Sequence, residues 1–416
     1  MTFDQFTLSN GLRIIGERID HFRSVSVGLW LGAGSQYEAL TEAGLSHFLE
    51  HMVFKGTAKR SARQIAEEMD AVGGQLNAFT AKECTCFYAK VVDEHLRLAM
   101  DVLADMATAP AFDPVELNKE KGVVIEEINM AEDTPEDVAS ELIMLAHYGD
   151  QPLSRPILGT APQIQAYQSG DLRRYWKRMY RPQNAVLAIA GHYDWDAVRA
   201  MAEEFLGGWA PEGFDRRECV THSVPPTLLV REKEIEQVHI CLGYPAIPMG
   251  DDRGFELSVF NSVFGGAMSS RLFQKIREDS GKAYSVYSYP NAYTDSGMLA
   301  VYAATNPESA EEVVDMILKE ARAIAEDGMT REEFAMAREQ MKASYIMGLE
   351  STSARMQSIG RRLLLLDKTR TEAETIERID AIDFDAANAL MRETLTAPHS
   401  VALVGKNVEA IGDSLQ

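Results

Sequence analysis

The chain has 416 residues, of which 46% are hydrophobic and 25% charged, and its formal net charge is −22. This length is too great for one ordinary domain and suits two domains of about 200 residues each. The acidic balance argues against a nucleic-acid partner, because a phosphate backbone requires patches of Lys and Arg, and no apolar run approaches the roughly 20 residues that cross a bilayer. We therefore expect neither a nucleic-acid nor a membrane partner, while the negative charge is compatible with basic peptides.

The chain begins MTFDQFTLSN, which is neither an Arg-rich transit peptide nor a signal peptide with a basic start and an apolar core. This start predicts a cytoplasmic protein, and the alternative is the mitochondrial matrix after removal of a targeting segment. Four cysteines give no disulfide framework in a chain this long. Cys84 and Cys86 alternate in a strand-like run and share one face, so we expect them to pack in the interior rather than to bind a metal.

The first half predicts strands among runs of helices. Its expected elements are a strand at 25–31, helices at 43–54 and 62–72, strands within 75–92, helices at 94–107 and 114–132, and an apolar strand at 184–191.

The helix expected at 43–54, with Thr41 as a plausible N-cap, contains His47, Glu50 and His51 in the order His-x-x-Glu-His. Histidines four residues apart lie one helical turn apart on one face, where they can hold one metal ion. A glutamate beside them can take a proton from a metal-bound water. Such a pair is often an accident of surface composition, but in this mostly apolar helix the polar groups would be costly to bury without partners.

A hydrolytic zinc site needs a third protein ligand and one open position for water. The candidates lie in the acidic helix expected at 114–132. Glu120 and Glu127 are seven residues apart, about two turns, and share a face, whereas Glu126 is rotated by roughly 100° from Glu127. Spacing alone does not choose among these three glutamates, and an ordinary solvated helix is the alternative.

The second half repeats the order of the first. Its expected elements are a strand at 237–244, a helix at 255–264, a further helical run to residue 279, strands within 283–304, helices at 307–326 and 330–350, and an apolar strand at 400–405. Together the halves predict the α+β class. The boundary should fall within 209–227, which is rich in Pro and Gly, and the predicted division is a first domain at 1–213, a linker at 214–228 and a second domain at 229–416. The helix of the second half that corresponds to the motif helix contains no histidine, so we expect one metal site per chain.

The arrangement resembles the pitrilysin/insulysin family of zinc metallopeptidases, the inverzincins, in which a liganding glutamate follows the His-x-x-Glu-His motif by some 75 residues. In this chain 75 residues separate His51 from Glu127. The resemblance implies that His47, His51 and Glu127 hold one Zn2+ ion per chain and that Glu50 is the general base. It also implies that Glu120 supports catalysis, and a carboxylate can do so by orienting a liganding histidine through its second ring nitrogen.

The likeness extends along most of the chain. The segments 8–13 (LSNGLR) and 44–57, together with Gly159, are similar to the processing-peptidase branch, which includes the β subunit of the mitochondrial processing peptidase and bacterial single-chain relatives. The resemblance implies two similar domains, each a mainly antiparallel sheet packed with helices, facing each other across a cavity. It also implies a homodimer or a heterodimer with a related subunit. The short segment Gly265-Gly266 is unlike the longer glycine-rich loop of the non-catalytic partners.

Four residues match substrate-binding positions of the family. The resemblance implies that Arg277 and Tyr284, seven residues apart in the second domain, bind a peptide carbonyl and stabilise the developing oxyanion. The alternatives are a surface ion pair for Arg277 and a packed strand residue for Tyr284. Asn77 and Ala78 match a strand edge that would hold an extended peptide through main-chain hydrogen bonds, and a plain hairpin edge is the alternative.

These features predict a zinc-dependent endopeptidase that hydrolyses unfolded peptides or presequence-like segments through a metal-activated water. The alternative is a non-catalytic peptide-binding or scaffold subunit of the same fold. A nucleotide-binding protein is disfavoured, because Gly32 and Gly34 are followed by Tyr37 where a G-x-G-x-x-G motif requires glycine.

Overall fold

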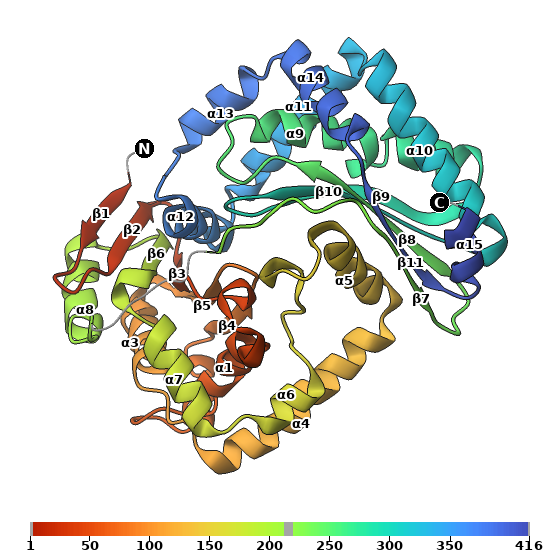
Figure 1. Ribbon diagram of the computed structural model, residues 1–416. Coiled ribbons are helices and arrows are strands. Elements are labelled where there is room, and N and C mark those ends of the chain that lie inside the picture. The colour runs from red at the N-terminus through yellow and green to blue at the C-terminus, as the bar shows by residue number, and fades with distance from the viewer. Residues whose placement is uncertain (1–2, 212–218, 415–416) are drawn as a thin grey trace. The chain divides into compact units, whose positions relative to one another are not determined.

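The structure, a computed structural model, describes residues 3–211 and 219–414 (Figure 1). By its contacts the chain divides into two compact units. The first unit runs to Ile128 and adds Pro156–Cys219 and Ile346–Ala373, and the second unit comprises Asn129–Arg155, Val220–Tyr345 and the residues from Glu374 onward. Each unit is one sheet with helices packed on it, so the predicted α+β class is confirmed.

The sheet of the first unit has the strand order β1-β2-β6-β3-β5-β4, in which only β2 and β6 are parallel neighbours. The central strands β3 and β6 read SVSVGLWL and AVLAIAG and are buried along almost their whole length, as expected where helices cover both faces. The strands are β1 (Asp4–Thr7), β2 (Arg13–Arg18), β3 (Ser24–Leu31), β4 (Gln75–Thr80), β5 (Thr85–Val92) and β6 (Ala185–Gly191).

Four helices of the first unit, α1 to α4, lie close to the positions predicted from the sequence. The helices of this unit are α1 (Leu45–Val53), α2 (Ala62–Asp70), α3 (Leu96–Thr108), α4 (Pro114–Asp133, to Ile128 in this unit), α6 (Ala161–Ala166), α7 (Ser169–Met179), α8 (Trp195–Leu206) and α12 (Thr352–Leu366). The prediction of Thr41 as the N-cap of the motif helix is wrong. Thr41 lies in the short turn η2 (Leu40–Glu42), and α1 is preceded by Gly44.

The second unit repeats the topology of the first. Its strand order is β7-β11-β8-β10-β9, and again a single parallel pair, β7 with β11, lies at one side of an antiparallel sheet. The strands are β7 (Leu228–Glu232), β8 (Val238–Ala246), β9 (Ala283–Ala292), β10 (Gly297–Thr305) and β11 (Ser400–Gly405). The helices are α5 (Pro135–Tyr148), α9 (Gly254–Asn261), α10 (Ala310–Asp327), α11 (Arg331–Gly348, to Tyr345 in this unit), α13 (Glu372–Asp380, from Glu374 in this unit), α14 (Phe384–Thr396) and α15 (Val408–Ser414). The repeat confirms two similar domains, and α9 corresponds to the motif helix α1 but carries no histidine.

Two helices are exchanged between the halves of the sequence. Helix α5 comes from the first half and packs on β8 and β11 of the second unit, while α12 comes from the second half and packs on β3 and β6 of the first unit (Figure 1). Polar contacts hold α12 there, including a hydrogen bond of 2.8 Å between the hydroxyls of Ser26 and Thr352 and a buried ion pair between Arg355 and Glu17. The domain bounds predicted from the sequence cut the chain at one place and therefore miss this exchange.

Residues 212–218, part of the predicted boundary and linker, lie outside the described residues, and β7 begins at the last residue of the predicted linker. The helix predicted at 255–264 is α9 followed by a wider π-type turn at Ser262–Gly266, and a second such turn spans Phe273–Asp279. Cys84 and Cys86 are buried beside Trp30, as expected of packed residues. Among the described residues, no helix is both long enough and apolar enough to span a bilayer.

Candidate metal centre and active site

The helix that carries the metal motif begins at a tightly packed glycine. Gly44 has φ of +85°, and a Cβ atom at this position would lie 2.6 Å from the carbonyl oxygen of Leu158. A Cβ atom on Gly159 would in turn lie 2.6 Å from the carbonyl oxygen of Ala43. Only glycine permits both the backbone conformation and this close approach. The segment around Gly159 thereby fixes the starting point of α1.

The two faces of α1 differ in burial. Phe48, Leu49, Met52 and Val53 are completely buried in the core of the first unit. The motif residues are only partly buried and lie on the other side of the helix. The sequence AGLSHFLEHMVF is mostly apolar, and in the structure His47, Glu50 and His51 share the less buried side of the helix.

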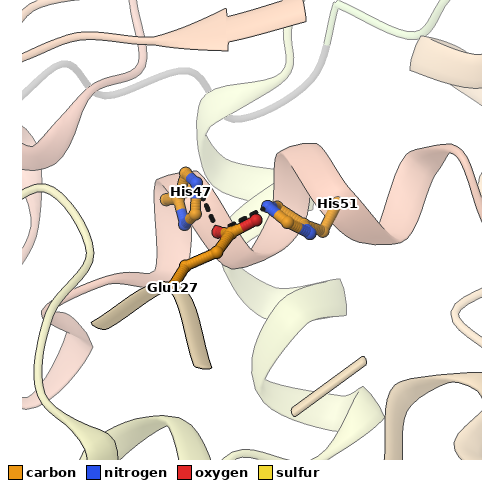
Figure 2. Close-up of side chains that lie close together, drawn as sticks. All are labelled: His47, His51 and Glu127. Carbon is orange, nitrogen blue, oxygen red and sulfur yellow. Dashed lines mark ion pairs between the residues drawn. The ribbon is translucent and has the colours of Figure 1, made fainter. Parts of the chain in front are cut away.

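Three side chains on two helices bring their donor atoms together (Figure 2). The Nε2 atoms of His47 and His51 lie 3.6 and 3.3 Å from the same carboxylate oxygen of Glu127 on α4. One ligand atom of each of the three residues lies within 4.8 Å of a ligand atom of both others. Glu126, one of the glutamates left open by spacing, is exposed and is not part of this group.

Glu120 supports His51 from the side opposite to Glu127. One carboxylate oxygen of Glu120 lies 2.9 Å from Nδ1 of His51, and the other lies 2.6 Å from Nζ of Lys55. Burial raises the pKa of Glu120, but the hydrogen bonds and charges of His51 and Lys55 outweigh burial and lower that pKa overall. The ionised carboxylate therefore holds the ring of His51 with Nε2 directed at Glu127.

Lys55 was not singled out from the sequence. It lies two residues beyond the end of α1, and its contact with Glu120 on α4 is a tertiary contact that no sequence spacing signals. We expect Lys55→Met to weaken zinc binding roughly 10-fold, the lower end of what loss of an outer partner costs, because Glu120 loses its cation. Titration of the protein with zinc against a competing chelator measures this change. Lys59→Met, at an exposed lysine nearby, is the matched control, and equal zinc affinity in both variants would contradict the prediction.

His47 is held differently from His51. Its Nδ1 atom is buried and has no hydrogen-bond partner among the described residues. Burial lowers the pKa of His47 to about 4, so the ring is neutral at pH 7 and Nε2 can offer a lone pair. The orientation of His47 is thus set by the backbone of α1 and by packing.

Glu50 lies beside the donor group without belonging to it. The hydroxyl of Thr80, the last residue of β4, donates a hydrogen bond of 2.5 Å to Oε2 of Glu50. Burial raises the pKa of Glu50, while this hydrogen bond and the charge of His51 oppose the rise. The structure therefore adds Thr80 to the site.

Replacing Thr80 by Val removes this hydroxyl with almost no change in shape. We expect Thr80→Val to lower kcat for peptide hydrolysis roughly 10-fold, because a hydrogen bond to a charged group contributes about 1.5–3 kcal/mol. Zinc content should not change, since Thr80 does not contact the donor atoms. Thr80→Ser keeps the hydroxyl and should restore most of the rate. Wild-type kcat in Thr80→Val would show that Glu50 does not depend on this contact.

Asn77 and Ala78 lie on β4, which is the edge strand of its sheet and has β5 as its only neighbour. The backbone N–H of Ala78 donates a hydrogen bond of 2.8 Å to the side-chain oxygen of Asn77. This N–H is therefore available to a new strand only after the Asn77 side chain moves. The edge strand exists as predicted.

Arg277 and Tyr284 lie together in the second unit. The guanidinium of Arg277 lies 4.6 Å from the ring centroid of Tyr284, within the range of a cation–π contact. Tyr284 is 75% exposed, so the alternative of a packed strand residue is wrong. The pair offers a cation and a phenol on the surface of the second unit.

The donor set fits a zinc ion. Two imidazoles and a carboxylate are ligands that Zn2+ takes, and three protein ligands leave a fourth position open for water or substrate. The second nitrogen of His51 is hydrogen-bonded to a carboxylate, as is common for histidines that bind zinc. A His-x-x-Glu-His helix with a glutamate from a second helix, on a repeated α+β fold, is an arrangement typical of zinc metallopeptidases.

Comparison with known proteins identifies the family. A model described as insulinase (peptidase family M16) matches residues 13–161, and a model described as the peptidase M16 inactive domain matches residues 167–341. The uncharacterized zinc protease YmxG of Bacillus subtilis (strain 168) is 43% identical over 404 residues, which are 96% of this chain and 97% of the relative. An uncharacterized zinc protease of Mycobacterium leprae (strain TN), ML0855, is 40% identical over 405 residues, which are 96% of this chain and 91% of the relative. The chain belongs to peptidase family M16.

Solved structures show the same fold at low sequence identity. The crystal structure of a peptidase M16 inactive domain from Pseudomonas fluorescens has a TM-score of 0.91 and 18% identity, covering 98% of this chain and 99% of that one. The crystal structure of a protease from Helicobacter pylori has a TM-score of 0.91 and 18% identity, covering 97% and 99%. The inactive-domain model matches a region without the His-x-x-Glu-His motif, which lies within residues 13–161.

Proposed function

We propose that the protein is a zinc-dependent endopeptidase that hydrolyses unfolded peptides. The observation that carries the proposal is the convergence of His47, His51 and Glu127, with Glu50 beside them and outside the donor set. His47, His51 and Glu127 would hold one zinc ion per chain, and the ion would act as a Lewis acid and lower the pKa of a bound water. Glu50 accepts the proton of the attacking water, Thr80 orients Glu50, and Glu120 orients His51.

The test combines two measurements on one preparation. Elemental analysis should give about one zinc per chain, and a quenched peptide of extended conformation should be cleaved internally, with loss of cleavage on chelation and recovery on adding zinc. Stoichiometric zinc without cleavage of any unfolded peptide would favour the alternative, a non-catalytic peptide-binding or scaffold subunit.

The proposed substrate is an extended chain held on the edge of β4. A peptide strand that pairs with this edge gains main-chain hydrogen bonds whatever its side chains, so such binding depends little on sequence. Asn77 would release the N–H of Ala78 as the peptide arrives. Arg277 and Tyr284 would contact the peptide carbonyl, since a guanidinium and a phenol both donate hydrogen bonds to an oxyanion. Presequence-like segments fit this requirement because they are unfolded.

The net charge of −22 leads to a further expectation about substrates. An Arg-rich peptide should be cleaved faster than a Glu-rich peptide of equal length at low salt, and the difference should shrink at 1 M salt, where the Debye length falls from about 10 Å to about 3 Å. Initial rates for both peptides at the two salt concentrations test this. Equal rates at low salt would contradict the charge preference but not the requirement for an extended chain, whereas efficient cleavage of a tightly folded protein would contradict that requirement.

The assembly and the location of the protein are also part of the proposal. A homodimer, or a heterodimer with a related subunit, follows from the resemblance to the processing-peptidase branch. Sedimentation at several protein concentrations distinguishes these from a monomer. A bacterial cytoplasmic location is supported by the bacterial origin of the relatives named above.

A further inference from the structure

A buried carboxylate lies at the beginning of the motif helix. Glu38 is 2% exposed and directly follows the short turn η1 (Ser35–Tyr37), six residues before Gly44. Its Oε2 accepts a hydrogen bond of 2.8 Å from the backbone N–H of Gly44, and its Oε1 accepts one of 2.6 Å from the backbone N–H of Ser46. The first N–H groups of a helix have no partner within the helix, and Gly44 has no side chain to supply one. Glu38 therefore replaces the missing N-cap from six residues upstream.

Such a cap is a costly way to begin a helix. Among the described residues, no Lys or Arg forms an ion pair with Glu38, and a buried carboxylate without a cation loses much of its solvation free energy. Burial raises the pKa of Glu38 to about 7, although the two backbone hydrogen bonds oppose the rise. Gly44 cannot carry a capping side chain of its own, because its φ is positive and a Cβ atom there would lie 2.6 Å from the carbonyl oxygen of Leu158, so the cap has to come from another residue.

What this cap adds is a fixed position for the first turn of α1. Ser46 is held twice, at its backbone N–H by Glu38 and at its hydroxyl, which lies 2.6 Å from the hydroxyl of Tyr175 on α7. His47 is the next residue. Since Nδ1 of His47 has no partner, the backbone at Ser46 and His47 is the main constraint on where Nε2 points. His51, by contrast, is oriented by Glu120.

We propose that Glu38 is a positioning residue for the metal centre, which fixes the first turn of α1 and thereby holds His47 in the geometry that binds zinc. This inference rests on the proposed zinc-peptidase function. Glu38 does for His47, through the backbone, what Glu120 does for His51 through a side-chain hydrogen bond.

The decisive variant is Glu38→Gln, which keeps the size of the side chain. A Gln amide has one oxygen acceptor, and its NH2 group would face one of the two backbone donors. We expect a roughly 10-fold to 100-fold weaker affinity for zinc, within the range seen when an outer partner of a zinc ligand is lost, measured by competition of zinc alone with a chelator. The visible absorption spectrum of the cobalt-substituted protein should also change, and kcat should fall while KM stays nearly constant.

Glu42→Gln is the matched control. Glu42 is a neighbouring glutamate that caps the turn η2 and pairs with Arg178 on α7. The Glu42→Gln variant should leave the zinc affinity, the absorption spectrum of the cobalt-substituted protein and kcat unchanged. Thermal unfolding of both variants gives the temperature range in which each is folded. If Glu38→Gln does not fold, Glu38→Asp is tested in its place. The Asp side chain keeps the charge but is shorter, so it reaches only one of the two N–H groups. An intermediate loss of zinc affinity is then expected.

The outcomes separate the two proposals. A wild-type protein that binds zinc and cleaves peptides, with unchanged zinc affinity and kcat in Glu38→Gln, overturns the role of Glu38 and leaves the proposed function intact. The same holds for unchanged values in Glu38→Asp if only that variant folds. A wild-type protein that binds no zinc overturns the proposed function and, with it, this inference.

Discussion

Glu50→Gln is expected to keep its zinc and to lose peptide hydrolysis by about 10²–10⁴-fold, the contribution of a general base. Glu50 lies outside the donor group of His47, His51 and Glu127, so its charge is not needed to hold the ion. A Gln side chain fills the same space and can still accept the hydrogen bond from Thr80, which occupies one oxygen of Glu50 at 2.5 Å. It has no basic oxygen that could take a proton from water. The variant therefore separates zinc binding from catalysis of peptide hydrolysis.

The measurement requires zinc content and kcat from the same preparation. Glu126→Gln is the matched control, because it also removes one carboxylate near the motif, from an exposed position on α4 outside the donor group, and it should change neither quantity. Turnover near the wild-type value in Glu50→Gln would mean that another group is the base. Glu120 would then be the next candidate, although its two oxygens are already occupied by His51 and Lys55.

The parts of the site that the sequence predicts well are those set by local helical geometry. His47 and His51 share a face of α1 because residues four apart always do so on a helix, and their tertiary surroundings do not alter this. The spacing of Glu120 and Glu127 on α4 follows the same rule. Spacing could not choose between Glu126 and Glu127, because that choice depends on which side of α4 faces α1, a tertiary contact. The family resemblance made that choice, and the structure has Glu127 beside the histidines.

The parts that the sequence did not predict depend on contacts between distant segments. The beginning of α1 was assigned to Thr41 because Thr is a good N-cap, whereas in the structure the role falls to Glu38 through two backbone hydrogen bonds. Nothing in the periodicity of α5 or α12 indicates that each packs on the sheet formed mainly by the other half, since an amphipathic helix can cover any apolar sheet face. The repeated topology was visible from the order of elements because both halves reuse one pattern of strands and helices.

His47→Ala and His51→Ala are each expected to abolish zinc binding and hydrolysis together. Each histidine supplies one of only three protein donors, so its loss leaves a two-ligand site. The affinity for zinc should therefore fall by more than the roughly 10–100-fold that loss of an outer hydrogen-bonding partner costs. His95→Ala is the matched control, because His95 is a partly exposed histidine of the first unit that pairs with Glu94.

The two variants should differ in their effect on folding. In His51→Ala the ionised Glu120 loses a hydrogen-bond partner while buried, and only Lys55 remains to it. In His47→Ala no hydrogen bond between described residues is lost, because Nδ1 of His47 has no partner among them and Nε2 lies 3.6 Å from Glu127. Without zinc, His51→Ala should therefore have the lower melting temperature of the two, by an amount that corresponds to about 1–3 kcal/mol for an unsatisfied buried group. Near-stoichiometric zinc in either variant would contradict the ligand assignment. Equal melting temperatures in the zinc-free variants would contradict the supporting role of Glu120. That role predicts that loss of the contact between His51 and Glu120 destabilises the fold more than loss of the His47 side chain does.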